Sequence, residues 1–81
     1  MNRATMRNMG SRIRTARKLL GFTQTELAKK LRVDQSSIAD WEAGNSMIHA
    51  SDLPALAAIL QVEVNFFFQQ DEDQDAATYD V

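Results

Sequence analysis

The chain has 81 residues, of which 44% are hydrophobic, so it has room for one small domain with a modest core and does not have the composition of a disordered protein. It contains no cysteine and a single histidine, His49, which excludes a disulfide framework, a thiolate nucleophile and a metal site built from histidines. The net charge is -2, no apolar run approaches the roughly 20 residues that span a bilayer, and no secretory signal opens the chain, so we expect a cytoplasmic protein.

The first predicted helix has apolar residues at three- and four-residue spacing, namely Met9, Ile13, Ala16 and Leu20. Gly21 follows directly and ends this helix, since glycine readily adopts the left-handed conformation found after a helix. Residues 1–10 are either an N-terminal arm or an extension of the same helix.

A second predicted helix begins after Thr23. Thr23 and Glu26 have the spacing of a capping box, in which the hydroxyl and the carboxylate each satisfy a free backbone amide. Residues 32 and 33 then form a turn, and Asp34 is a suitable N-cap for a third helix over residues 35–43. Gly44 ends this third helix.

The fourth predicted helix is capped by Ser51, tolerates Pro54 in its first turn, and carries an apolar stripe at Leu53, Leu56, Ala57 and Leu60. A short fifth helix is expected within residues 62–70. Residues 71–81 are acidic and polar, and we expect them to form a disordered tail. Five helices without a strand signal predict an all-α bundle.

The segment 23–42 resembles the helix-turn-helix of the phage repressor and Cro-type family, to which many small XRE-like bacterial regulators belong. The resemblance rests on a glutamine at the start of each motif helix, Gln24 and Gln35, eleven residues apart, and it covers roughly residues 12–68. It implies a compact five-helix lambda-repressor-like domain over residues 11–70. It also implies that the helix 35–43 lies in the major groove of double-stranded DNA.

The distribution of charge agrees with a polyanionic partner. All nine basic residues lie at or before Arg32, whereas ten of the eleven acidic residues lie at or after Asp34. The basic half supplies a positive surface for DNA. The acidic end would repel the same DNA, so we expect it to contact either the basic half or a basic protein partner.

The exposed face of helix 35–43 is the predicted base-reading surface, because Ile38 and Trp41 point toward the core. Gln35 is the leading reader, since its amide can pair with N6 and N7 of one adenine and discriminate by about 1 to 3 kcal/mol. Asp40 would either accept a hydrogen bond from cytosine N4 or lower the affinity for DNA in general. The predicted base-reading residues are Gln35, Ser36, Ala39 and Asp40.

Contacts to phosphate are predicted beside this face. Gln24 begins its helix, where its side chain and the adjacent amides can hold a phosphate, and the resemblance implies that it also hydrogen-bonds Gln35. The resemblance further implies an ion pair between Arg17 and Glu42, with Arg17 still able to reach phosphate. The predicted phosphate contacts are Thr23, Gln24, Ser37, Asn45, Arg17, Arg3 and Arg7, the last two from an arm that touches phosphate or enters the minor groove.

Arg32 departs from the family pattern, because it stands in the turn where a glycine is usual. The backbone at this position must therefore either accept a left-handed residue or turn differently.

We expect a homodimer, because a single helix-turn-helix covers few base pairs and proteins of this type gain affinity on operators with two-fold symmetry. Three consecutive phenylalanines cannot all point into one small core, so part of this region should be free to dimerise. The predicted dimer interface consists of Ile59, Phe66, Phe67 and Phe68.

The sequence therefore predicts a sequence-specific transcriptional regulator, in its simplest form a repressor, from a bacterium or phage and located on the nucleoid. No nucleophile and base occur at a recognisable spacing, so we expect no enzymatic activity, metal or cofactor. The alternative is a protein-interaction module, such as an antitoxin whose acidic tail binds a basic partner.

Overall fold

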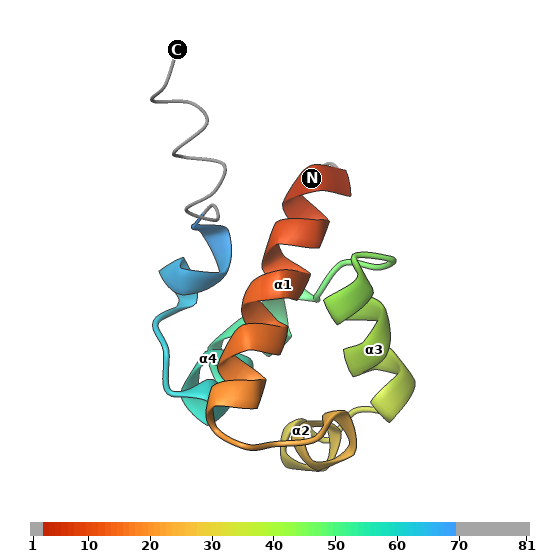
Figure 1. Ribbon diagram of the computed structural model, residues 1–81, viewed down its shortest axis with the longest axis vertical. Coiled ribbons are helices and arrows are strands. Elements are labelled where there is room, and N and C mark those ends of the chain that lie inside the picture. Colours follow the sequence, from red (N-terminus) through yellow and green to blue (C-terminus); the bar gives the residue numbers. More distant parts are fainter. Residues whose placement is uncertain (1–2, 70–81) are drawn as a thin grey trace.

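The computed structural model describes residues 3–69, which form four α-helices and two short 3-10 helices without any strand, so the predicted all-α fold is confirmed. In chain order these are α1 (Arg3–Leu19), α2 (Gln24–Leu31), α3 (Gln35–Ala43), η1 (Ala50–Asp52), α4 (Leu53–Leu60) and η2 (Val64–Phe68). α1 runs through the middle of the molecule, with α3 on one side and η2 and α4 on the other (Figure 1). No helix in residues 3–69 is long and apolar enough to cross a membrane.

The core forms where the apolar stripes of the helices meet. Its largest fully buried side chains come from five elements and are Ile13, Leu27, Ile38, Leu56, Leu60 and Phe67. Helices as short as α2 and α4, with eight residues each, are not stable in isolation. Their stability therefore comes from this shared burial, which contributes about 1.5–3 kcal/mol for each large apolar side chain.

Left-handed residues follow the helices. Gly21 and Gly44 have φ angles of 78° and 75°, as their glycine identity predicts. Arg32 has a φ of 64° and ends α2, with its amide donating to the carbonyls of Ala28 and Lys29. The turn thus has the backbone geometry that is usual for glycine. For a residue with a side chain, such as arginine, this left-handed conformation costs roughly 1–2 kcal/mol.

The predicted N-cap of α3 is confirmed in its position, whereas the predicted N-cap of α4 is wrong. Asp34 occupies the N-cap position of α3 with extended backbone, but its side chain makes no capping hydrogen bond. Ser51 lies inside η1, and η1 runs directly into α4 because Asp52 is itself in a right-handed helical conformation. Since no extended residue separates η1 from α4, Ser51 has no free first turn to cap.

The short fifth helix expected within residues 62–70 is the five-residue 3-10 helix η2. With three residues per turn, consecutive side chains of η2 point in different directions. Phe67 enters the core, whereas Phe68 is 44% exposed. The acidic tail predicted over residues 71–81 lies outside the described residues.

α1 begins at Arg3, so residues 3–10 extend the first helix rather than form an arm. Within this extension α1 comes very close to α3. A Cβ atom on Gly10 would lie 2.2 Å from the carbonyl oxygen of Trp41 and 2.6 Å from that of Glu42. Glycine inside a helix costs about 0.5–1 kcal/mol relative to alanine, and this close approach is the reason that the position accepts it.

Replacing Gly10 by alanine is expected to lower the free energy of unfolding by roughly 1–3 kcal/mol, because α3 must move away to admit the methyl group. Urea denaturation followed by Trp41 fluorescence measures the change. The control is Ser11→Ala at the next, exposed position of α1, where the higher helix propensity of alanine should leave stability unchanged or slightly raised. A Gly10→Ala protein as stable as the native chain would show that α1 and α3 do not pack this closely.

Candidate nucleic-acid interface

The predicted capping box fixes the start of α2. The Thr23 hydroxyl accepts a hydrogen bond from the Glu26 amide at 3.0 Å, and the Thr23 amide donates to Glu26 Oε1 at 2.9 Å. The hydrogen bond from the Thr23 backbone, followed by the interaction with its side chain, lowers the pKa of the Glu26 carboxyl. α2 therefore begins at Gln24, and the first amides of this helix have no partner within it.

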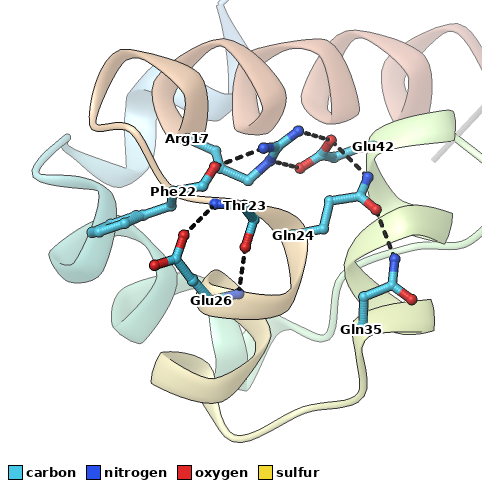
Figure 2. A network of polar contacts seen from close by, with 7 residues as sticks. All are labelled: Arg17, Phe22, Thr23, Gln24, Glu26, Gln35 and Glu42. Atoms are coloured by element: carbon cyan, nitrogen blue, oxygen red, sulfur yellow. Dashed lines mark hydrogen bonds and ion pairs between the residues drawn. The ribbon is translucent and has the colours of Figure 1, made fainter.

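Four side chains form a continuous chain of polar contacts from α1 to the start of α3, which we call the Arg17–Gln35 chain (Figure 2). Arg17 binds Glu42 through Nε to Oε2 at 2.7 Å and Nη2 to Oε1 at 3.0 Å. Gln24 Nε2 donates to Glu42 Oε1 at 3.1 Å, and Gln35 Nε2 donates to Gln24 Oε1 at 2.7 Å. Because Gln35 begins α3 and Glu42 lies near its end, the chain holds both ends of this helix.

Each of the three nitrogens of the Arg17 guanidinium donates a hydrogen bond inside the protein. Its Nη1 donates to the carbonyl of Phe22 at 2.7 Å, in addition to the two bonds to Glu42. The side chains of Arg17 and Glu42 are only 9% and 4% exposed. The expected ion pair is therefore present, but a buried guanidinium whose three nitrogens all donate internally is not placed to bind phosphate, which corrects the prediction that Arg17 contacts DNA.

Gln24 also has less freedom than its sequence position suggests. Its amide nitrogen donates to Glu42 and its amide oxygen accepts from Gln35, so both ends of the side chain are engaged. The contact with Glu42 was not anticipated from the sequence. What remains at this position for a phosphate is the backbone at the start of α2, where the helix dipole favours an anion.

The exposed face of α3 is the one expected from helical periodicity. Ile38 and Trp41 are buried, whereas Ser36 and Asp40 are exposed and Ala39 is half-buried. Gln35 is exposed as well, so the base-reading candidates lie together along one side of α3. A glutamine amide has two hydrogens and an acceptor oxygen, and the bond to Gln24 uses only one of the hydrogens.

The predicted phosphate contacts flank this face. Thr23 and Asn45 are exposed, and Ser37 is half-buried. Arg7 lies against the end of α3, because a Cβ atom on Gly44 would be 2.9 Å from its Cγ. Arg3 and Arg7 are exposed but belong to α1, and a helix about 10–12 Å across does not enter a minor groove about 6 Å wide. Residues 3–10 therefore do not form a minor-groove arm, and contact of Arg3 and Arg7 with phosphate stays a prediction.

Only part of the predicted dimer interface is accessible. Phe67 is 0% exposed and belongs to the core, so its assignment to an interface is wrong. Ile59 and Phe66 are half-buried, and Phe68 is exposed. Val64, which the sequence did not single out, is 36% exposed on the same short helix.

The comparisons with known proteins agree with this geometry. A model of the helix-turn-helix family matches residues 13–67. The HTH-type transcriptional regulator DicA of Escherichia coli strain K12 is 39% identical over 66 residues, which cover 82% of this chain and 49% of that protein. An uncharacterized HTH-type transcriptional regulator of Sinorhizobium medicae is 39% identical over 62 residues, which cover 76% of this chain and 45% of that protein. The chain therefore spans about half the length of these relatives.

Solved structures share the fold. The restriction-modification controller protein C.AhdI from Aeromonas hydrophila has a TM-score of 0.75 and 28% identity, over 80% of this chain and 98% of that one. The hypothetical transcription factor NHTF from Neisseria has a TM-score of 0.79 at 19% identity, over 95% of this chain and 90% of that one, and shows the fold alone. The family match covers more than half of the protein. It includes the two motif helices and all four residues of the Arg17–Gln35 chain. The chain belongs to the helix-turn-helix family.

Proposed function

We propose that the chain is a sequence-specific regulator that binds double-stranded DNA with α3 in the major groove and represses by occupying a two-fold symmetric operator as a dimer. The observation that carries this proposal is Gln35, which is exposed at the start of α3 and held by Gln24 at 2.7 Å. Relatives named as transcriptional regulators, and a structural neighbour named as a controller protein, support it. The protein acts in the cytoplasm, without catalysis or cofactor.

Gln35 is suited to adenine. The hydrogen of Nε2 that Gln24 does not take, together with Oε1, forms the donor and acceptor pair that matches N7 and N6 of one base. Ordering a free glutamine side chain costs up to about 1.5–2 kcal/mol of rotamer entropy. The bond to Gln24 meets part of this cost before DNA arrives, so more of the contact energy is available for discrimination.

The next positions on α3 complete the reading surface. Ser36 and Ala39 are small, which lets the backbone approach the base edges, and the Ala39 methyl can pack on a thymine methyl. Asp40 is exposed among them. Its carboxylate opposes the negative potential of DNA, so it either accepts from a cytosine N4 or lowers affinity for all sequences alike.

Phosphate contacts position α3 without reading sequence. Thr23, with the first amides of α2, lies at one end of the reading surface, and Asn45 lies just past Gly44 at the other. Ser37 lies on α3 between them. Arg7 and Arg3 add positive charge beside Asn45, since Arg7 packs against Gly44.

The dimer forms through an apolar patch at the end of the domain, which we call the η2 patch and define as Ile59, Val64, Phe66 and Phe68. Phe68 and Val64 are its exposed members, and Ile59 and Phe66 are partly buried against the core. Two copies of one patch meeting across a two-fold axis make a closed dimer. This symmetry matches a two-fold symmetric operator.

Selection of bound fragments from a random duplex library is expected to give a two-fold symmetric consensus for the native chain. Gln35→Ala should relax the preference at one base pair per half-site and cost about 1–3 kcal/mol there. Gln24→Ala is the matched control, because it removes the support of Gln35 but not the reader, and should weaken binding while leaving the consensus in place. An unchanged consensus for Gln35→Ala would exclude it as a reader, and no enrichment by the native chain would refute the proposed function.

Asp40→Asn is expected to strengthen binding to random-sequence DNA several-fold at low salt, because it removes one like-charge repulsion from the groove face. Electrophoretic mobility shifts over a range of salt concentrations measure this gain. Glu63→Gln, an exposed change of the same charge away from α3, should give no comparable gain. Loss of binding that is confined to sites containing cytosine would instead identify Asp40 as a direct reader.

Phe68→Asp is expected to shift the chain from dimer to monomer at micromolar concentration, because it places a charge in the η2 patch. Sedimentation equilibrium measures the change. Met47→Asp is the matched control: Met47 is 45% exposed and Phe68 is 44% exposed, but Met47 lies in the loop after α3. A Phe68→Asp chain that dimerises as well as the Met47→Asp chain would place the interface elsewhere.

A further inference from the structure

The described part of the chain ends beside the middle of α1. The carbonyl of Gln69 accepts hydrogen bonds from Asn8 Nδ2 and from Arg12 Nε, the latter at 3.2 Å. The Arg12 guanidinium also lies 5.2 Å from the centre of the Phe66 ring, which ties η2 to the same stretch of α1. The residues that follow Gln69 therefore start from a fixed point next to Asn8 and Arg12.

The sequence on the two sides of this point is strongly complementary in charge. Residues 71–75 carry four carboxylates in five positions, and no acidic residue precedes Glu26 in the whole chain. α1 exposes Arg3, Arg7 and Arg14, none of which forms an ion pair with another residue among 3–69. At about 100° of rotation per residue these three arginines fall within about 40° of one another on α1.

The arginines lie within reach of the acidic residues. They occupy the side of α1 toward α3, as the contact of Arg7 with Gly44 shows, whereas Asn8 and Arg12 occupy the side toward η2. α1 is about 10–12 Å across with its side chains. Six residues of extended chain span up to about 20 Å, so the stretch from Gln69 to Asp75 is long enough to cross the exposed ridge of α1.

We propose that the acidic segment 71–75 docks across α1 onto Arg3, Arg7 and Arg14 and competes there with the phosphates of DNA. The competition rests on the proposed function, in which Arg3 and Arg7 contact phosphate. Each exposed ion pair is weak, but tethering gives the segment an effective concentration in the millimolar range. The tethered segment therefore competes with non-specific DNA, which binds through phosphate contacts alone, while base contacts let the operator complex form in spite of the segment. Because both kinds of complex must displace the segment, the segment weakens both, and the weaker non-specific complexes become largely unoccupied while the tighter operator complex still forms.

The test uses the full chain with its acidic segment neutralised by Asp71→Asn, Glu72→Gln, Asp73→Asn and Asp75→Asn. This variant is expected to bind a random-sequence duplex about tenfold more tightly than the native chain at low salt, with a smaller gain at high salt. When Arg3, Arg7 and Arg14 are first changed to glutamine, the gain should fall to less than about twofold. Changing the exposed Lys18, Lys29 and Lys30 to glutamine instead removes the same charge elsewhere and should leave most of the gain.

An equal gain in the two arginine backgrounds would overturn the proposal, because the carboxylates would then repel DNA without docking on α1. If the native chain binds duplex DNA but neutralising its acidic segment gives no gain, the proposal is overturned as well. A second measurement needs no DNA: the Nε–Hε resonances of Arg3, Arg7 and Arg14 should shift between the native and the neutralised chain at low salt, and unchanged resonances would contradict docking. If these resonances shift while the native chain binds no duplex, the docking stands and the proposed function fails.

Discussion

The orientation of α3 and of its proposed reading surface depends on one buried ion pair, Arg17 with Glu42. Taking two charges out of water costs several kcal/mol for each ion, and the cost is offset only when the remaining hydrogen-bonding groups find partners. Here the carbonyl of Phe22 accepts a hydrogen bond from the third nitrogen of the guanidinium, and Gln24 donates a hydrogen bond to the carboxylate of Glu42. Gln24 is thereby fixed in orientation, and it fixes Gln35 in turn. The position of Gln35, the proposed base reader, is therefore set by the interior of the protein.

This pair requires α1 and α3 to be close, and Gly10 makes that possible. Without a Cβ atom at Gly10, the backbone of α1 lies directly against the carbonyls of Trp41 and Glu42. The same helix buries Ile13 in the core and exposes arginines toward the end of α3. α1 thus contributes to the core, supports α3 and carries part of the charged surface. It can do all three because its different faces contact different elements as it passes through the middle of the fold.

The three phenylalanines show how little a composition says about burial. They are consecutive, and the tight turn of η2 sends Phe67 into the core, lays Phe66 under Arg12 and leaves Phe68 exposed. Phe67 stabilises the domain, whereas Phe68 has area left for a second copy. A sequence of apolar residues predicts that some of them are exposed, but the direction of each follows from the helix type and from what packs against it.

The sequence by itself determined the features that depend on local spacing: the helices, the capping box at Thr23 and Glu26, the exposed face of α3, and, through its resemblance to a family, the ion pair and the bond between Gln24 and Gln35. It did not determine the burial of Arg17, the role of Gly10, the second partner of Gln24 or the separate fates of Phe66, Phe67 and Phe68. Arg17 and Gly10 contact residues at positions 41 and 42, and Phe67 packs in a core built from all four α-helices. Only the tertiary structure decided these, because burial and partner choice are set by residues that are distant in the chain and adjacent in space.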